Sequence, residues 1–245
     1  ISTAPSRQIL YIKKLQFLNI KIYVEKPAFT TKVDLYSVQS LILKKGFLTE
    51  GLMYRFGAGY KYFVNKLLNV KESNYDLSLD FILPNQDGII KNSFRSKLDV
   101  KSSIIYDIGS YIFDLIWTLE IFEFQISNIK FELFQNNVLK RLNFILVSTN
   151  NCFDRKVNVN IGYGNNYKNE IKFISKDGFF NISPFFWGRK GTINIVDYKE
   201  TPEKKNQINT KGGLQELLFK WFNGIEDKII CDLQSFNRYE FIISE

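Results

Sequence analysis

The feature that most constrains the fold is a series of short segments in which apolar and polar residues alternate. Such alternation is the pattern of a half-buried β-strand, because successive side chains point to opposite faces. Short turns such as Lys176-Asp177-Gly178 separate the segments, and short turns join antiparallel neighbours. We therefore predict one large, mostly antiparallel sheet, with strands over Asp76 to Leu83, Gln125 to Gln135, Leu139 to Ser148, Arg155 to Tyr163, Glu170 to Ile174, Phe179 to Ser183 and Thr192 to Tyr198.

The residues before this series follow a different order, in which helical and strand patterns alternate. A helical spacing of apolar residues from Ile9 to Leu18 precedes a short β-branched strand over Ile20 to Val24. A second helix over Lys32 to Lys45 leads to another strand over Phe47 to Phe56. This order is typical of a parallel sheet with helical crossovers.

Together the two patterns predict a fold that is α/β in its first part and α+β in its second. A partial Rossmann-type parallel sheet is expected over residues 1–56. A domain with a large open, mostly antiparallel β-sheet flanked by helices is expected over residues 57–245. Lys199 to Gly213 is predicted to be a polar loop. Helices of this second domain are expected over Tyr60 to Leu68, Ser110 to Leu119, Leu214 to Phe222 and Asp232 to Ile243.

Charge and length narrow the classes of function. Lysine plus arginine total 33 and aspartate plus glutamate total 25, which gives a formal net charge of +8 at pH 7. The lysines are scattered rather than gathered into one patch, so we predict a solvated surface and no nucleic-acid partner. No apolar run is long enough to span a bilayer, and we predict no membrane partner.

Histidine and cysteine usage limits the chemistry further. The chain has no histidine, so His-based triads and His-ligated metal sites are excluded, and we predict no metal site. Any acid–base role must come from Lys, Asp, Glu, Tyr or Cys. Cys152 and Cys231 form neither a metal-binding spacing nor a disulfide framework. Reduced thiols of this kind are typical of the cytoplasm, where we expect the protein to be.

Two short motifs carry candidate chemistry. Glu25-Lys26-Pro27 directly follows the first predicted strand, at the carboxyl edge where ligands bind in open α/β sheets. Later in the chain, Asp107 and Tyr111 stand four residues apart, which places a carboxylate and a phenol on one face of a helix. A lysine, an aspartate and a tyrosine brought together can move a proton at an alcohol or carbonyl carbon.

Each of these residues also has a structural alternative. Lys26 could be a surface lysine at the end of a strand, and Asp107 could cap a helix N-terminus. Tyr111 could be a packed ring with a single hydrogen-bond partner. If the three act together, we expect them to converge in space. A nearby cation would then lower the pKa of Tyr111 from its ordinary value of about 10 toward the working pH.

The ordered set of motifs resembles the Gfo/Idh/MocA oxidoreductases. The tyrosine form of the second motif is similar to the branch of glucose-fructose oxidoreductase and dimeric dihydrodiol dehydrogenase. Glu50 to Phe56, Phe94-Arg95 and Ile174 to Ile182 extend the resemblance over nearly the whole chain. It implies hydride transfer between NAD or NADP and an alcohol or carbonyl group of a sugar or sugar derivative. By the resemblance, the catalytic residues are Lys26, Asp107 and Tyr111, the cofactor-binding residues are Thr3, Glu25 and Lys26, and the substrate-binding residues are Arg55 and Arg95.

The chain also departs from that family. Gln8 stands where the family has a histidine, and Lys101-Ser102-Ser103 stands where it has a glycine run. The stretches Gly57 to Tyr62 and Gly162 to Tyr167 each have a tyrosine in place of the third glycine of a phosphate loop, and neither follows a strand and opens a helix. We therefore expect an N-terminally truncated chain that holds only the later part of the nucleotide-binding domain.

Two functions stay open from the sequence. The first is the oxidoreductase, and the second is a non-catalytic scaffold or truncated remnant of such an enzyme that associates through its sheet. The alternating aromatic strands predict an apolar sheet face that joins two copies of the chain, since a large exposed apolar patch is a liability in a monomer. We expect a homo-oligomer, and the resemblance implies a dimer.

Overall fold

The computed structural model describes residues 1–3, 5–44, 47–68, 74–84, 104–119, 124–134, 137–149, 153–198, 204–210, 212–224 and 237. Contacts between Cα atoms divide these residues into two compact units. The first unit comprises the described residues within Ile1–Leu52, Ile90–Glu120 and Glu216–Glu245, and the second those within Met53–Ile89 and Ile121–Gln215. The predicted division into domains over residues 1–56 and 57–245 stays a prediction.

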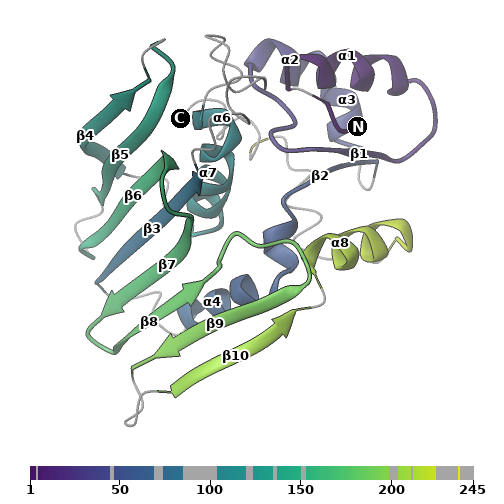
Figure 1. Ribbon diagram of the computed structural model, residues 1–245. Coiled ribbons are helices and arrows are strands. Elements are labelled where there is room, and N and C mark those ends of the chain that lie inside the picture. The colour runs from purple at the N-terminus through teal and green to yellow at the C-terminus, as the bar shows by residue number, and fades with distance from the viewer. Residues whose placement is uncertain are drawn as a thin grey trace. The chain divides into compact units, whose positions relative to one another are not determined.

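The first unit contains a two-stranded parallel sheet, in which β1 (Ile22–Val24) pairs with β2 (Leu48–Glu50). The helix α1 (Pro5–Leu15) precedes β1, and α2 (Lys32–Tyr36) and α3 (Gln39–Ile42) connect β1 to β2 (Figure 1). The strand–helix–strand order predicted from the sequence is therefore present. The core of this unit consists of buried apolar residues from the helices and both strands, including Ile12, Val24, Leu35 and Leu48.

The helix predicted over Lys32 to Lys45 is divided into α2 and α3. Thr31 caps α2, because its hydroxyl accepts a hydrogen bond from the backbone N–H of Asp34 at 3.1 Å. Ser37 follows the last residue of α2, and its hydroxyl donates to the Asp34 carbonyl at 2.7 Å. Such a side-chain bond competes with the backbone pairing that would continue a helix.

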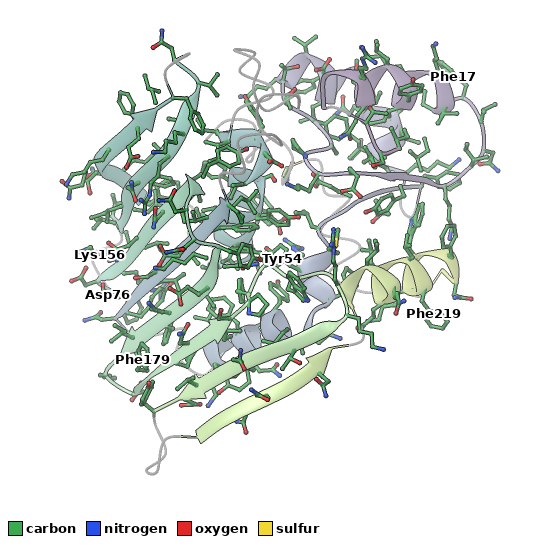
Figure 2. All side chains as sticks on the ribbon, viewed as in Figure 1. Phe17, Tyr54, Asp76, Lys156, Phe179 and Phe219 are labelled. Atoms are coloured by element: carbon green, nitrogen blue, oxygen red, sulfur yellow. The ribbon has the colours of Figure 1, made fainter. Side chains whose placement is uncertain are left out.

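Three further helices contribute to the first unit. The predicted helix over Ser110 to Leu119 is α7 (Gly109–Thr118), and a short α6 (Ile104–Asp107) precedes it with Ile108 between them. The residues of α8 (Gly213–Phe222) from Glu216 onward also belong to this unit. Lys21 holds the end of α8, since its ammonium donates to the Trp221 carbonyl at 2.6 Å. Exposed aromatic rings remain on this unit, including Phe17 and Phe219 (Figure 2).

The second unit is built on one eight-stranded sheet in the order β10-β9-β8-β7-β3-β6-β5-β4 (Figure 1). Only β3 and β6 are parallel, and the other neighbours are antiparallel. The predicted fold class, α/β with a large and mostly antiparallel sheet, is therefore confirmed. The strands are β3 (Tyr75–Pro84), β4 (Phe124–Leu133), β5 (Leu139–Ser148), β6 (Arg155–Gly164), β7 (Lys168–Ser175), β8 (Gly178–Ser183), β9 (Gly191–Asp197) and β10 (Lys204–Thr210).

Two element predictions in this region are wrong in part, and one cannot be compared. The strand predicted over Phe47 to Phe56 ends at Glu50, and a 3-10 helix, η1 (Met53–Phe56), follows it before α4 (Ala58–Leu68). The loop predicted over Lys199 to Gly213 contains the edge strand β10, whose polar residues suit a strand with one free edge. The helix predicted over Asp232 to Ile243 lies outside the described residues. Within the described ranges, no helix combines the length and the apolar character needed to cross a membrane.

The two faces of the eight-stranded sheet differ in polarity. The helix α4 covers one face, and its Phe63 ring lies 6.1 Å from the ring of Phe180 in β8. The other face, which we call the open face, carries charged and amide side chains, for example Asp76 opposite Lys156 (Figure 2). The prediction of an apolar contact face is therefore wrong for the open face. The alternation along each strand turns most apolar residues toward the buried side of the sheet. Apolar residues of the sheet remain exposed mainly along the edge strand β4, as at Phe131.

A buried aspartate joins α4 to the sheet. Asp197 in β9 accepts a hydrogen bond from the Tyr62 hydroxyl at 2.6 Å, and the Lys66 ammonium lies 2.6 Å from the same carboxylate oxygen. Burial, followed by the hydrogen bond to Asp197, raises the pKa of Tyr62 from 10.0 to about 12. The pKa of Lys66 is also raised, chiefly by its hydrogen bond to Asp197.

These pKa shifts predict a loss of stability in strong base. A group whose pKa is raised by folding contributes stability that is complete below its unfolded value and disappears as the pH rises through its folded value. For Tyr62 the loss therefore begins above pH 10 and is complete above about pH 12. Urea unfolding should show the stability of the wild type falling more steeply above pH 10 than that of Tyr62→Phe. Parallel curves for the two proteins would contradict the assignment.

Candidate active site

The candidate site lies at the carboxyl edge of the parallel pair in the first unit. Because β1 and β2 run in the same direction, the residues that follow them, Glu25 and Gly51, meet at one edge. The Gly51 N–H donates to the Val24 carbonyl at 2.9 Å, and the Glu25 N–H donates to the Ile1 carbonyl at 3.0 Å. The peptide bond that follows, between Lys26 and Pro27, is cis.

Lys26 is paired with a residue 81 positions later in the chain. Its ammonium donates to the Asp107 carboxylate oxygen Oδ1 at 2.8 Å and also to the Asp107 backbone carbonyl. The side chains of Lys26 and Asp107 are only 14% and 7% exposed. Separation of the two side chains would leave two charges with little water contact and no partner, which costs several kcal/mol. The ion pair therefore holds both side chains in place. The ammonium of Lys26 is therefore fixed at the edge of the sheet.

Tyr111 completes the group, with its ring beside the Lys26 ammonium. The Lys26 ammonium lies 4.5 Å from the centre of the Tyr111 ring, which is the geometry of a cation–π contact. Asp107 ends α6 and Tyr111 lies in the first turn of α7, so the two come from successive helices rather than from one. The structure thus brings Lys26, Asp107 and Tyr111 together. We call these three residues the Lys26 cluster.

Two acidic residues and a second tyrosine lie at the same edge. The Tyr23 hydroxyl donates to the Glu25 carboxylate at 2.9 Å, and burial is the main cause that raises the pKa of Tyr23. Glu50 is 3% exposed, and its carboxylate accepts a hydrogen bond from the Ala28 N–H at 2.8 Å. A methyl group on Gly51 would lie 2.6 Å from the Tyr23 hydroxyl oxygen, so the absence of a side chain at residue 51 makes room for this pair.

The pKa of the Tyr111 phenol is raised, and this corrects the expectation that Lys26 would lower it. Burial is the largest cause, and Lys26 opposes it. The carboxylates of Asp107, Glu25 and Glu50 raise the pKa further. The phenol therefore stays protonated at neutral pH. In this state it can donate a proton to an oxygen that gains negative charge, whereas it cannot act directly as a base.

The other residues predicted for the site are placed differently. Thr3 is exposed in the first unit, and its backbone carbonyl accepts a hydrogen bond from the Gln8 amide at 3.2 Å. Arg55 lies in η1, belongs to the second unit and is 1% exposed, so it presents almost no surface to a ligand. Arg95 lies outside the described residues, as do Lys101 to Ser103. The substrate-binding roles of Arg55 and Arg95 stay predictions.

Sequence reasoning missed Tyr23 and Glu50, which lie in the same carboxyl-edge region. Both carried a signal that could have been used. Tyr23 stands two positions before Glu25 in a strand, so their side chains share a face. Glu50 ends the second parallel strand, and the carboxyl ends of parallel strands meet at the same edge. The helix-cap alternative for Asp107 finds no support, since the N-cap of α7 is Ile108.

The two glycine stretches, Gly57 to Tyr62 and Gly162 to Tyr167, are not phosphate loops in the structure. Gly57 precedes α4 after η1, and Gly162 to Gly164 form the last part of strand β6. Neither stretch is a loop between a strand and a helix, which a phosphate loop requires. In the part of the chain that the structure describes, no group of three or more Cys, Asp or Glu side chains could hold a metal ion.

Comparisons by sequence and by structure give different results. No protein-family model and no curated protein matches the chain. Among solved structures, a 3-ketoreductase from Actinomadura kijaniata in complex with TDP-benzene and NADP is similar in fold, with a TM-score of 0.76 at 11% identity over 99% of this chain and 74% of that chain. An aldose-aldose oxidoreductase from Caulobacter crescentus complexed with glycerol gives a TM-score of 0.77 at 16% identity over 99% and 75%.

A third solved structure shows the same likeness. The UDP-N-acetylglucosamine 3-dehydrogenase from Acidithiobacillus ferrooxidans gives a TM-score of 0.72 at 12% identity, over 100% of this chain and 74% of that chain. At such low identities the likeness is one of fold. It extends over both units, because nearly the whole chain is covered in each of the three comparisons.

Proposed function

We propose that the protein is an NAD(P)-dependent oxidoreductase that transfers a hydride to or from a carbon of a sugar or sugar derivative. The observation that carries the proposal is the Lys26 cluster, in which an ammonium, a carboxylate and a protonated phenol meet at the carboxyl edge of parallel strands. The similar folds of a 3-ketoreductase in complex with NADP and of an aldose-aldose oxidoreductase support it.

The residues at this edge fit a nicotinamide cofactor. A nicotinamide carboxamide donates two hydrogen bonds, and Glu25 offers carboxylate oxygens as acceptors beside Lys26. The oxidised ring carries a positive charge, which the nearby carboxylates of Glu25 and Glu50 would stabilise. Glu25 and Lys26 would hold the cofactor here, and the resemblance adds Thr3. When bound, NAD or NADP supplies the hydride or accepts it.

The Lys26 cluster would handle the proton that accompanies hydride transfer. In the direction of carbonyl reduction, the neutral Tyr111 phenol donates its proton to the substrate oxygen as negative charge develops there. The Lys26 ammonium stabilises the same charge, and Asp107 keeps the ammonium in position. In the reverse direction the substrate hydroxyl would return its proton to the phenolate form of Tyr111. Because the pKa of this phenol is raised, Tyr111 carries the proton that carbonyl reduction needs at neutral pH.

Other parts of the protein take roles that we propose on the resemblance. Residues 1–56 would form the later part of the NAD(P)-binding domain, and residues 57–245 would bind the substrate and join copies of the chain. Arg55 and Arg95 would position the sugar-like substrate. A cytoplasmic homo-oligomer that associates through the sheet completes the proposal.

The test is a substrate survey with the full-length protein. NADPH or NADH is mixed with aldoses, keto sugars and nucleotide-linked keto sugars, and the absorbance of the reduced cofactor is followed. We expect at least one sugar carbonyl to be reduced, with turnover that is saturable in substrate. If saturating cofactor is never consumed with any sugar while the copies still associate, the non-catalytic scaffold is the better account.

A further inference from the structure

The hydrogen-bonded pair of Tyr23 and Glu25 lies at the same carboxyl edge of the parallel strands as Lys26. Residues two positions apart along an extended segment project from the same face, so the two side chains lie next to each other. The Tyr23 hydroxyl donates to the Glu25 oxygen Oε1 at 2.9 Å, and both residues are half-buried. A hydrogen bond to a carboxylate is about twice as strong as one between neutral groups. Tyr23 therefore holds the Glu25 carboxylate in one orientation.

Tyr23 keeps its role as a donor over the whole range of pH in which the protein works. Burial is the largest cause that raises the pKa of its phenol, and the charge of Glu25 raises the pKa further. The phenol therefore stays protonated at neutral pH, and the hydrogen bond to Glu25 is present throughout.

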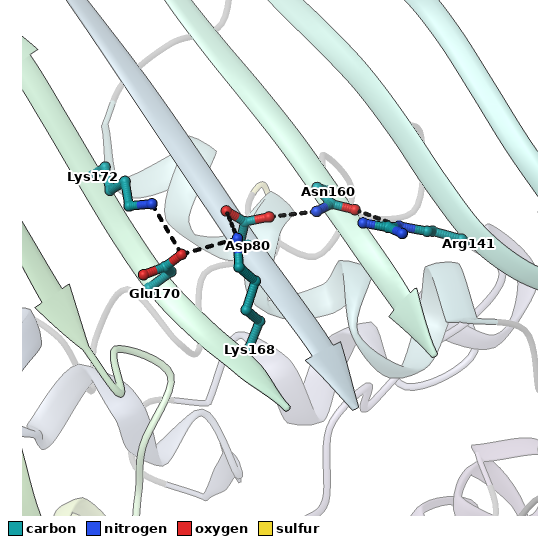
Figure 3. A network of polar contacts seen from close by, with 6 residues as sticks. All are labelled: Asp80, Arg141, Asn160, Lys168, Glu170 and Lys172. Carbon is teal, nitrogen blue, oxygen red and sulfur yellow. Dashed lines mark hydrogen bonds and ion pairs between the residues drawn. The ribbon is translucent and has the colours of Figure 1, made fainter. Parts of the chain in front are cut away.

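The Glu25 carboxylate differs from the carboxylates on the sheet of the second unit. On the open face, both oxygens of Asp80 are used by the protein, since Oδ1 accepts from the Asn160 amide and Oδ2 from the Lys168 ammonium at 3.1 Å (Figure 3). For Glu25, the described residues provide a partner for Oε1 and none for Oε2. The second oxygen of Glu25 can therefore accept a hydrogen bond from a ligand without giving up a bond inside the protein.

Gly51, which directly follows β2, leaves the space that this oxygen occupies. A methyl group at residue 51 would lie 2.6 Å from the Tyr23 hydroxyl oxygen and 3.0 Å from the Glu25 oxygen Oε2. The first distance is one that side-chain carbons essentially never adopt, so a side chain at residue 51 would displace the pair. The free oxygen of Glu25 thus lies close to the backbone at the end of the second parallel strand, the edge at which open α/β sheets bind their ligands.

We propose that Tyr23 is a positioning residue for the nicotinamide carboxamide, which it serves by holding Oε1 of Glu25 so that Oε2 accepts a carboxamide N–H. Gly51 keeps the place of Oε2 free. The inference rests on the proposed function, because it requires NAD or NADP at this edge. A carboxylate that is already fixed loses little further freedom when the cofactor binds, which increases the affinity. Tyr23 acts through Glu25 and not on the reacting atoms.

The test compares two oxidised cofactors by titration calorimetry with the full-length protein. One is NAD or NADP, whichever binds more tightly, and the other is its acetylpyridine analogue, in which a methyl ketone replaces the carboxamide and removes the N–H donors. The wild type should prefer the natural cofactor about tenfold, the usual effect of a hydrogen bond to a charged group. Tyr23→Phe should reduce this preference to about threefold or less, mainly by weakening the natural cofactor, and Glu25→Ala should abolish it.

A double variant separates positioning from packing. Because Tyr23 acts through Glu25, adding Tyr23→Phe to Glu25→Ala should change the preference no further. Gly51→Ala should lower the preference as Tyr23→Phe does, and it provides the test if Tyr23→Phe does not fold. Tyr62→Phe is the matched control, since the Tyr62 hydroxyl also donates to a carboxylate, that of Asp197. This control should keep the preference of the wild type.

Three results would overturn the inference. The first is equal binding of the two cofactors by the wild type. The second is a preference that neither Tyr23→Phe nor Gly51→Ala reduces, with thermal melts showing that the variants are folded. Both results leave the proposed function standing if a sugar carbonyl is still reduced. The third is that the full-length protein binds neither cofactor, which would overturn the proposed function as well.

Discussion

Tyr111→Phe is expected to lower kcat by about 100-fold or more, the usual effect of removing a positioned proton donor. The substitution takes away only the hydroxyl, so the ring that the Lys26 ammonium contacts at 4.5 Å is kept. The affinity for NAD or NADP should therefore change little, and the loss should appear in kcat rather than in the cofactor KM. Steady-state kinetics with the best sugar from the survey would measure both. Equal turnover by the two proteins would show that Tyr111 is only a packed ring.

Lys26→Met should lower kcat by a similar factor, for an electrostatic reason. Methionine keeps the length of the side chain and removes the charge that stabilises the developing oxyanion, an effect worth roughly 10²–10³ in rate in comparable sites. It also leaves the buried Asp107 carboxylate without its ammonium partner. Some loss of stability is therefore expected, and thermal melts must show that the variant is folded at the assay temperature.

The chain offers a matched control for both variants. Tyr62, Lys66 and Asp197 form a second group of the same three residue types, in which Lys66 also lies over a tyrosine ring, at 5.4 Å. This group joins α4 to β9 and has no proposed catalytic role. Tyr62→Phe and Lys66→Met should therefore keep kcat within about twofold of the wild type. A loss of activity as large as that of Tyr111→Phe would mean that the assay reports folding rather than chemistry.

Asn169→Ala is expected to destabilise the protein by about 2–4 kcal/mol, an effect at the high end for a single polar substitution. Asn169 in β7 is 2% exposed, and its amide makes four hydrogen bonds. Its oxygen accepts from the Phe185 and Phe186 N–H groups, and its nitrogen donates to the Phe186 carbonyl and the Tyr167 hydroxyl. The Phe185 N–H keeps a second acceptor, the Asn169 backbone carbonyl at 3.0 Å.

The cost of Asn169→Ala therefore comes mainly from the hydrogen bonds that the N–H and carbonyl of Phe186 make to the Asn169 amide. Urea unfolding would measure the change in the free energy of unfolding. Asn181→Ala is the matched control, because the side-chain oxygen Oδ1 of Asn181 is buried and has no hydrogen-bond partner among the described residues. That variant should change stability by less than about 1 kcal/mol. Similar losses in the two variants would contradict the role assigned to Asn169.

The regular parts of the fold were predictable because they depend on local patterns. The strand over Leu139 to Ser148 has the predicted bounds, because its apolar run, Phe144 to Val147, is followed by the polar stretch Ser148 to Asn151. The edge strand β10 was missed because its residues are mostly polar, and a polar stretch predicts a loop. The break between α2 and α3 lies beside the hydrogen bond of the Ser37 hydroxyl to the Asp34 carbonyl, which a helical spacing of apolar residues does not reveal.

The sequence predicted which residues form the Lys26 cluster, but it did not predict the direction in which the pKa of Tyr111 is shifted. Lys26 and Asp107 stand 81 positions apart, so no local pattern connects them, and only the ordered motifs indicated that they would meet. The direction of the Tyr111 pKa was wrong because burial, which outweighs the effect of Lys26, depends on residues from the whole unit. Glu50 was missed because the predicted strand continued to Phe56, so Glu50 was not recognised as the carboxyl end of a parallel strand.

The most direct test of the account is to follow the hydride itself. The full-length protein is supplied with NADPH or NADH carrying deuterium at both C4 positions of the nicotinamide, together with a sugar carbonyl that supports turnover. Mass spectrometry and proton NMR of the sugar product should show one deuterium on the former carbonyl carbon, and its rate of appearance should fall about 100-fold in Tyr111→Phe. A product without deuterium, or one labelled equally fast by Tyr111→Phe, would contradict the assignment of the Lys26 cluster as the active site.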